Sequence, residues 1–265
     1  MLPKLISLKE AAGLVQDGVK VALGGNILHR IPSSFVRELA RLKKKGLELI
    51  KTAGGYDVDL LCAAGCVDAV HAGCVGFENE FGFAPNYRKA VEEGRVKAYE
   101  NSCYTIITGL RAAAYGVPFL PVAGMWGSDL LEARDFLVVK DPYTMEEVVA
   151  IPRLEPDWAV LHVQECDVYG NARILGTPFE DVLMSRAAKG VILTAERIVP
   201  TEALVAQPER SQIPGFLVSA VVEAKAGARP GSCYPYYDYD PDAVREYLAI
   251  SENPDKLANY LSSVI

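Results

Sequence analysis

The chain has 265 residues, of which half are apolar and 23% are charged, a composition typical of globular proteins and unlike that of disordered, collagen-like or coiled-coil chains. No apolar run approaches the roughly 20 uncharged residues of a membrane span, and Lys4, Lys9 and Glu10 interrupt the stretch where a secretory signal needs an apolar core. A net charge of −7 without a basic block argues against a nucleic-acid partner. We therefore expect a cytoplasmic protein that binds neither nucleic acid nor a membrane.

Helical patterns alternate with apolar, valine-rich runs in the N-terminal half. Ser7 and Glu10 have the spacing of a capping box, which favours a helix start, and Pro32 suits the first turn of a helix that Gly46 closes. In chain order, we predict a helix over 7–16, a strand over 19–23, a helix over 32–46, a strand over 47–52, a helix over 57–64, a strand over 67–75, a helix over 85–93, a strand over 96–99 and a helix over 102–115.

The alternation continues in the second half, with one interruption. Two runs around Asp141-Pro142-Tyr143 indicate a hairpin, and the residues from Asp167 to Asn171 predict a tight turn. In chain order, the elements predicted here are strands over 119–122, 136–140, 148–151 and 158–164, a helix over 179–189, strands over 191–195 and 216–222, and helices over 241–248 and 253–262.

Apolar strands that alternate with helices predict an α/β fold with an open, mainly parallel sheet and helices on both faces. The sequence contains no evident linker or internal repeat, so we expect a single domain over residues 1–265. Ligands of such sheets bind outside the carboxyl ends of the strands. The loops that follow strands therefore hold the candidate site residues.

Gly24-Gly25-Asn26 follows a predicted strand and precedes a helix. Glycines let the backbone approach a ligand, and free amides in such a turn can hold an anion or a polarised carbonyl oxygen. We therefore take Gly24, Gly25 and Asn26 as candidate substrate-binding residues. The turn lacks the GxGxxG pattern and the chain has no GxxxxGK[ST] sequence, so a plain tight turn is the alternative interpretation.

The loop over 75–86 combines three phenylalanines with two glycines and two acidic residues. Aromatic loops at a strand end can form the wall of an apolar pocket, which makes Phe77 a candidate substrate-binding residue. A packed surface loop is the alternative. Farther along, Trp126 and Ser128 belong to another glycine-containing loop, and both are candidates, although Ser128 or Asp129 can also cap the segment that follows.

Glu100 and Asn101 end a predicted strand just before a helix. A carboxylate in this place can act as a general base, as a nucleophile or as a partner of the helix start. We take Glu100 as the candidate catalytic base and Asn101 as a candidate substrate-binding residue.

The six cysteines are too sparse for a disulfide scaffold. Cys62, Cys66 and Cys74 could belong to a metal cluster, but no CxxC pair exists and only three histidines are present. Buried free thiols and no bound metal are therefore the expected state. The histidines show no Ser-His-Asp or Cys-His pattern, and His162 lies in an apolar run that indicates a core or interface position.

A set of motifs follows one another in a characteristic order. These motifs are Asp17-Gly18, Gly24-Gly25, 110–121 (LRAAAYGVPFLP), 127–130 (GSDL), 157–160 (DWAV), 167–171 (DVYGN), 196–198 (ERI), 214–218 (PGFLV) and 227–230 (GARP). The ordered set, which covers essentially the whole chain, resembles the α subunit of family I coenzyme A transferases, of the glutaconate CoA-transferase kind.

The resemblance implies an open α/β fold and a β subunit of the same family as partner, usually in an α2β2 assembly. It implies chemistry at the α–β interface, in which a β-subunit glutamate attacks an acyl-CoA thioester and carries CoA to a carboxylic acid. Coenzyme A is then substrate and product, and no cofactor stays bound. Gly24 and Gly25 would shape the acyl pocket and hold the thioester oxygen.

The same family includes a ring-opening hydrolase of steroid degradation and a decarboxylase, both acting on CoA thioesters. In the hydrolase, the catalytic glutamate lies in the α subunit. It follows the strand before the Arg-Ala-containing helix, where Glu100 stands in this chain. The resemblance therefore also allows a hydrolase or decarboxylase that uses Glu100 as a base on a carbon acid or on water. An acyl-CoA-binding protein without turnover is a third interpretation.

One departure from the family pattern concerns the acyl group. Many α subunits carry an arginine between the proline and the Gly-[Ser/Thr]-Asp of this segment, whereas residues 121–129 contain none. Met125 and Trp126 stand there instead, which favours an apolar acyl chain over a dicarboxylic one. A strong preference for thioesters with a terminal carboxylate would contradict this hypothesis.

Overall fold

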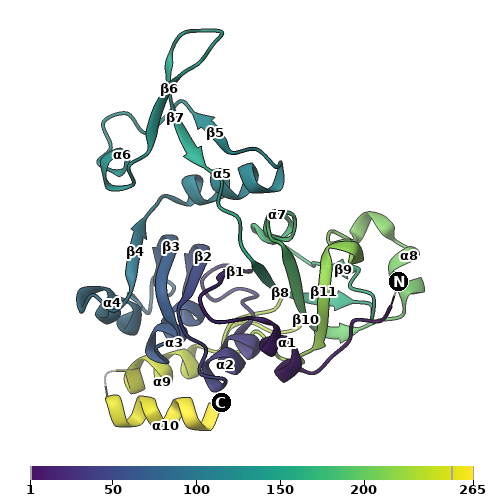
Figure 1. The fold of residues 1–265 in the computed structure, drawn as a ribbon. Coiled ribbons are helices and arrows are strands. Elements are labelled where there is room, and N and C mark those ends of the chain that lie inside the picture. Colours follow the sequence, from purple (N-terminus) through teal and green to yellow (C-terminus); the bar gives the residue numbers. More distant parts are fainter. Residues whose placement is uncertain (1, 252, 265) are drawn as a thin grey trace.

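The computed structural model describes residues 2–251 and 253–264, and a mainly parallel sheet forms its centre (Figure 1). The strand order is β11-β10-β8-β1-β2-β3-β4, and only the two-residue strand β9 pairs antiparallel, with β8. This arrangement confirms the predicted fold class. The bounds are β1 (Lys20–Leu23), β2 (Leu47–Gly54), β3 (Val67–Val75), β4 (Lys97–Glu100), β8 (Trp158–Cys166), β9 (Ala172–Arg173), β10 (Gly190–Ile198) and β11 (Val218–Glu223).

The central strands are apolar on both sides because helices cover both faces of the sheet. In β1, Val21 and Leu23 belong to one hydrophobic cluster, and Ala22, between them, belongs to the cluster on the opposite face. Side chains alternate between the faces of a strand, so a continuous apolar run is what a sheet buried on both sides requires.

One cluster collects helices α1, α2, α3, α4 and α9, and α10 packs on α9 and α2. The other cluster collects α5 and α7. The bounds are α1 (Leu8–Leu14), α2 (Ser33–Arg41), α3 (Tyr56–Ala63), α4 (Pro85–Glu92), α5 (Cys103–Ala114), α7 (Asp181–Ala187), α9 (Pro241–Ser251) and α10 (Pro254–Val264). The capping box predicted at the first helix is present, with both the Ser7 and the Glu10 side chains bonded as expected.

An arm over residues 119–152 projects from the body beyond α5 (Figure 1). It is a three-stranded antiparallel sheet in the order β5-β7-β6, so the predicted hairpin is confirmed. Val122, Val149 and Ile151 form a small core of its own. The bounds are β5 (Phe119–Val122), α6 (Leu130–Ala133), β6 (Leu137–Lys140) and β7 (Glu147–Pro152).

The structure differs from the predicted elements in two respects. The helix predicted over 32–46 ends at Arg41, because Lys43 turns the backbone to a φ of +54° and leads the chain into β2. The short elements α6, α8 (Thr201–Val205) and β9 were not predicted. Each is too short for its apolar residues to show the periodicity of a helix or a strand.

Cysteine burial was also predicted only in part. Four thiols are buried, but Cys74 and Cys103 are exposed, and all six are free. No helix among residues 2–251 and 253–264 is long and apolar enough to cross a membrane.

Candidate functional site

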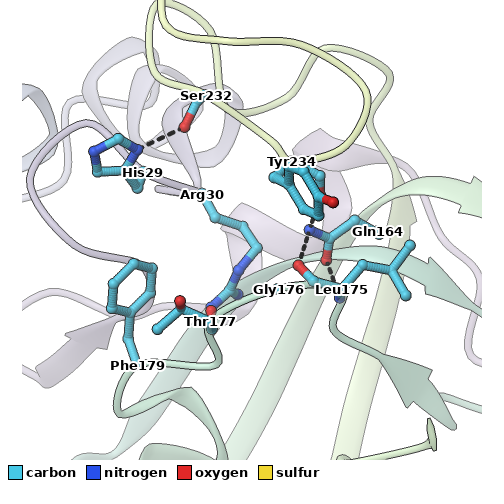
Figure 2. Close-up of a pocket in the computed structure, with 9 residues that line it drawn as sticks. All are labelled: His29, Arg30, Gln164, Leu175, Gly176, Thr177, Phe179, Ser232 and Tyr234. Atoms are coloured by element: carbon cyan, nitrogen blue, oxygen red, sulfur yellow. Dashed lines mark hydrogen bonds between the residues drawn. The ribbon is translucent and has the colours of Figure 1, made fainter.

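The strand order reverses between β1 and β8. From β1 the chain runs through β2 and β3 to one edge of the sheet, and from β8 it runs through β10 to the other. Ligands of open α/β sheets bind outside the carboxyl ends of the strands at such a reversal. A pocket of about 390 Å³ lies there (Figure 2). Its lining residues are His29, Arg30, Gln164, Leu175, Gly176, Thr177, Phe179, Ser232 and Tyr234.

A tight turn at the end of β1 brings His29 and Arg30 to this pocket. Gly25 has a φ of +71°, and a Cβ atom on it would lie 2.4 Å from the His29 carbonyl oxygen. A Cβ atom on Gly24 would lie 2.6 Å from Oδ2 of Asp181. The position of Gly25 therefore requires glycine, both for its backbone conformation and for its close approach to backbone atoms. At Gly24, a side chain would have to displace the Asp181 and Leu161 side chains.

The predicted free amides of this turn are not free. The Gly24 N–H donates to the Val160 carbonyl (2.9 Å), the Gly25 N–H to Oδ1 of Asp181 (2.8 Å) and the Asn26 N–H to the His29 carbonyl (2.9 Å). In this structure these three amides therefore offer no free N–H group to a thioester oxygen. The glycines shape the wall of the site by letting the chain turn sharply, and the half-buried Asn26 closes the turn.

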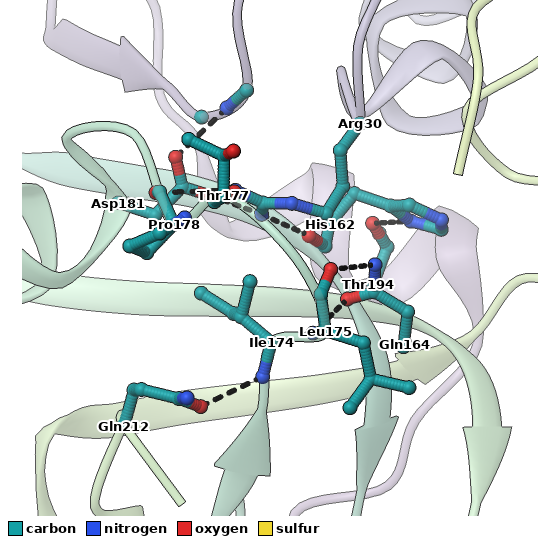
Figure 3. Close-up of polar contacts among 12 residues, drawn as sticks. Arg30, His162, Gln164, Ile174, Leu175, Thr177, Pro178, Asp181, Thr194 and Gln212 are labelled. Carbon is teal, nitrogen blue, oxygen red and sulfur yellow. Dashed lines mark hydrogen bonds and ion pairs between the residues drawn. The ribbon is translucent and has the colours of Figure 1, made fainter. Parts of the chain in front are cut away.

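Arg30 ties three segments of the pocket together (Figure 3). Its Nη1 donates to Oδ2 of Asp181 (2.5 Å) and to the His162 carbonyl (2.7 Å), and its Nη2 donates to the carbonyls of Thr177 and Pro178. Both side chains of the Arg30–Asp181 pair are at most 4% exposed. A charge-assisted network of this kind fixes the turn, β8 and the start of α7 in one geometry.

Gln164 and Ser232 fix the opposite wall (Figure 2). The Gln164 amide accepts from the Leu175 N–H (3.1 Å) and donates to the carbonyls of Leu175 (2.9 Å) and Tyr234. Ser232 Oγ lies 2.8 Å from His29 Nδ1. Tyr234, at the mouth of the pocket, is 69% exposed. The pocket is thus preformed, with a rigid base and an open mouth.

A buried polar layer lies beneath this wall. His162 Nε2 is 2.8 Å from Oε1 of Glu196, and His162 Nδ1 is 2.9 Å from the Thr194 hydroxyl. Glu196 also accepts from the Tyr237 hydroxyl and from the N–H groups of Ala226 and Gly227. Of the two positions predicted for His162, core or interface, the structure of this chain shows the core position, since His162 is fully buried.

Burial and hydrogen bonding determine the protonation states of His162 and Glu196. Burial lowers the pKa of His162 despite its bond to Glu196. Burial alone would raise the pKa of Glu196, but the bonds from His162, Tyr237 and Ala226 outweigh it, and that pKa lies below its ordinary value. The layer therefore holds a neutral imidazole that donates from Nε2 to a carboxylate and accepts at Nδ1 from Thr194.

The same layer brings three groups of metal-ligand type together. One ligand atom each from His162, Glu196 and Cys233 lies within 4.8 Å of the others. However, both oxygens of Glu196 already accept hydrogen bonds, and burial raises the pKa of the Cys233 thiol to about 12. A side chain that binds a metal must be deprotonated and must have a free lone pair. These three residues therefore favour a structural role over metal binding.

Acidification is expected to destabilise the fold through His162. The unfolded chain has the ordinary histidine pKa near 6.5, and the folded value lies below it. Below that pH the unfolded state binds a proton that the folded state does not. Stability, fully present above the unfolded pKa, should therefore fall at up to about 1.4 kcal/mol per pH unit. Urea unfolding at pH 7.5, 6.5 and 5.5 should give a shallower dependence for His162→Gln, and identical slopes would contradict this assignment.

Glu100 occupies a separate place, at the carboxyl end of the edge strand β4. It is exposed, and it lies between a hollow of about 120 Å³ that Cys74 and Tyr87 line and one of about 320 Å³ that Phe83 and Tyr87 line. Burial, together with the charges of Cys62 and Glu100, raises the pKa of Tyr87 to about 12, so its hydroxyl stays protonated. Glu100 does not cap α5, because Ser102 and Thr105 do.

The structure separates the remaining predicted residues. Phe77 is 6% exposed and packs against Tyr247 in the core, so its predicted place in a pocket wall is wrong, and Phe83 lines a hollow instead. The Asn101 amide donates to the Tyr99 carbonyl, and Asn101 lines a further pocket that is described below. Trp126 and Ser128 are exposed on the arm, and Ser128 accepts from the Leu130 N–H at the start of α6.

The carboxyl edge of the sheet thus carries two candidate places. Gly24, Gly25 and Asn26 lie beside the central pocket, whereas Glu100 lies on β4, three strands from β1 and therefore roughly 14 Å away across the sheet. Sequence reasoning missed Arg30 and Gln164. The signal that could have found them is a charged or amide side chain in a run that is otherwise apolar.

Known proteins match this chain over most of its length. The family model for coenzyme A transferases matches residues 5–224. An uncharacterized protein of Archaeoglobus fulgidus is 37% identical over the whole chain, which spans 60% of that protein's length. The A-subunit of glutaconate CoA-transferase from Acidaminococcus fermentans is 34% identical over 96% of this chain and 85% of its own. The cholesterol ring-cleaving hydrolase IpdA subunit of Mycobacterium tuberculosis is 33% identical over 93% and 88%.

Two solved structures match over nearly the whole chain. Glutaconate coenzyme A-transferase from Acidaminococcus fermentans gives a TM-score of 0.92 at 33% identity, covering 98% of this chain and 88% of that chain. A variant of the decarboxylase AibA/AibB gives 0.90 at 31% identity, covering 99% of each. The similar proteins thus carry three different reaction names on one fold.

Proposed function

Because the chain belongs to the coenzyme A transferase family, we propose that it is the α subunit of a heteromeric CoA-transferase. In this proposal a β subunit of the same family completes the enzyme, in an α2β2 assembly. The complex moves CoA from an acyl-CoA to a carboxylic acid through a glutamyl-CoA thioester on the β subunit. One of the similar proteins, at 34% identity, is a transferase subunit, which supports this reaction.

The observation that carries the proposal is the state of the carboxylates near the central pocket. Asp181 and Glu196 are buried and each accepts several hydrogen bonds, and Asp57 is paired with Lys51. A nucleophilic carboxylate must reach the thioester carbon with a free oxygen. Among the described residues, none of these three buried groups does so, which favours a nucleophile supplied by a partner.

The proposed chemistry divides between the two subunits. The partner's glutamate attacks the thioester carbonyl, the tetrahedral oxyanion collapses, and CoA leaves as a thiolate, which gives an acyl anhydride. The thiolate then attacks the glutamyl carbonyl, releases the first carboxylic acid and leaves glutamyl-CoA, and the acceptor acid reverses these steps. This chain supplies the preformed pocket at the β1–β8 reversal, where rigid walls position the acyl group and limit water.

A second function is favoured by the position of Glu100. Among the described residues, no side chain forms a hydrogen bond or ion pair with its carboxylate, which lies between two hollows at the carboxyl edge and near the protonated Tyr87. An accessible carboxylate with a nearby proton donor suits a general base on a carbon acid or on water. The alternative is therefore an α subunit of a C–C hydrolase or a decarboxylase acting on a CoA thioester.

Glu100→Gln distinguishes these functions in the complex with the β subunit. We expect CoA exchange between an acyl-CoA and an isotope-labelled carboxylic acid, followed by mass spectrometry, to survive the substitution. Removal of a general base would instead lower the rate by about 10²–10⁴-fold. Glu93→Gln, on the exposed end of α4, is the matched control. Hydrolysis or decarboxylation without exchange, lost only in Glu100→Gln, would replace the transferase with the second function.

Absence of any turnover by the assembled complex would overturn both the transferase function and the hydrolase or decarboxylase function. Binding of acyl-CoA by the isolated chain, without a partner, would then point to a binding protein on the same fold.

A further inference from the structure

A further pocket, of about 160 Å³, lies between α5, the sheet and the arm, and it shares no lining residue with the cavities described above. Its polar lining consists of Lys20, His71, Asn101, Thr105, Arg134 and Arg153. Four of these six side chains are basic, and they come from β1, β3, the arm and the segment after β7. The site therefore exists only because the fold brings these distant segments together.

His71 forms the floor of this pocket. It is 6% exposed, and its ring stacks on Tyr99 with centroids 4.1 Å apart. Its Nε2 lies 2.6 Å from Oε1 of Glu48, which fixes the ring. Its Nδ1 is buried, and no described residue bonds to it. A buried ring nitrogen without a partner costs about 1–3 kcal/mol, so a ligand group that bonds to it is favoured.

Arg134 approaches from the arm. Its guanidinium lies over the ring of Tyr99 (4.8 Å) and over that of Phe136 (5.3 Å). Its Nε is buried and bonds to no described residue. Among the described residues, no carboxylate pairs with Arg134 or with Arg153. The aromatic rings hold the guanidinium in place and leave its N–H groups available to a ligand.

The Glu48 carboxylate contacts two residues that line this pocket, and it already interacts with both. Lys20 Nζ lies 3.4 Å from its Oε1, and His71 binds the same oxygen. Glu48 thus pairs with Lys20, whereas the Arg134 guanidinium interacts with the charges of Asp135 and Glu48 only at longer range and forms no ion pair with a described carboxylate. A guanidinium in this state matches the paired oxygens of a carboxylate or phosphate.

We propose that this pocket binds a small oxyanion, a carboxylate or phosphate group, between Arg134, Arg153 and Nδ1 of His71. Its volume equals that of about five water molecules in the liquid, enough for such a group. Burial lowers the pKa of His71 in the free chain, so binding of the anion has to be accompanied by uptake of a proton at Nδ1. In the complex, Nε2–H donates to Glu48 and Nδ1–H donates to the anion. The inference stands apart from the proposed reaction, because it concerns binding at a different pocket and requires no turnover.

The three histidines make the site observable. We expect inorganic phosphate or succinate, titrated into the full chain at pH 6.0, to shift the imidazole ¹H–¹³C resonances of His71 saturably and to leave those of His162 unchanged. His71→Gln assigns the signal. Arg134→Gln should weaken binding at least tenfold, and Arg153→Gln should weaken it as well. Arg88→Gln, an exposed arginine paired with Glu92, is the matched control and should bind as the wild type does.

The two probes separate the possible sources of the anion. Tighter binding of phosphate would point to a phosphorylated ligand, and tighter binding of succinate to a ligand with a carboxylate. A His71 resonance that stays fixed with both probes would overturn the proposal. So would a resonance that shifts in Arg134→Gln and Arg153→Gln at the same probe concentrations as in the wild type. Because the readout is binding to this chain alone, failure of the transferase assay would leave the result unaffected.

Discussion

Replacing Lys51 with methionine is expected to lower the free energy of unfolding by about 3–5 kcal/mol. Lys51 Nζ lies 2.6 Å from Oδ2 of Asp57 and donates to the Gly24 carbonyl at 2.6 Å, and both side chains of the ion pair are fully buried. Methionine fills a similar volume but leaves the Asp57 carboxylate buried without its counter-charge. Since Lys51 also holds the turn at the end of β1, activity of the complex should fall with stability.

Urea unfolding of a double-mutant cycle checks this expectation. Asp57→Asn should be similarly costly, because it leaves a buried ammonium group. The double variant Lys51→Met/Asp57→Asn should recover a large part of the loss, since no unpaired charge remains. Lys89→Met, at the end of α4 on the surface, should change stability by less than about 0.5 kcal/mol. A loss of that small size in Lys51→Met would mean that the ion pair is not closed in solution.

Gly25→Ala is expected to destabilise the protein by about 2–5 kcal/mol, which combines backbone strain at positive φ with overpacking. The new Cβ atom would meet the carbonyl oxygens of His29 and Arg30 at 2.4 and 2.5 Å. These are backbone atoms that cannot rotate away. The turn that presents Arg30 to Asp181 would therefore open, and the pocket at the β1–β8 reversal would lose its shape.

Gly13→Ala is the matched control for this substitution. Gly13 lies inside α1, and a Cβ atom there would meet nothing within 4 Å. Alanine should therefore raise stability by roughly 0.5–1 kcal/mol, because it lowers the entropy of the unfolded chain and suits a helix. Thermal unfolding of the two variants should move in opposite directions, and equal shifts would contradict the argument from backbone conformation.

Local sequence signals account for most of the fold. Strands such as β8 and β10 are buried on both faces and occur as continuous apolar runs, and Ser7 and Glu10 indicate the first helix by their hydrogen-bonding groups alone. These features depend on residues within a few positions of one another. The two-residue strand β9 depends on its distant partner β8 and carries no such signal.

The candidate site was less predictable for a physical reason. The glycines after β1 indicate a site. Whether the Gly25 N–H group is free depends on Asp181, which is distant in the sequence and accepts a hydrogen bond from it. Similarly, Arg30 and Gln164 line the same pocket because β1 pairs with β8. Glu100 was placed correctly at a strand end, yet the sequence holds no information on which strand lies at the edge.

The pairing of β1 with β8 also sets a condition on biosynthesis. Val21 pairs with Trp158, and the N-terminal Ile6 N–H bonds to the Val221 carbonyl. As the chain leaves the ribosome, one side of β1 has no partner until β8 emerges, on the order of ten seconds later or more. Non-local parallel pairing of this kind folds slowly and exposes an unpaired strand edge. We therefore expect nascent chains of this protein to associate with chaperones before the second half is synthesised.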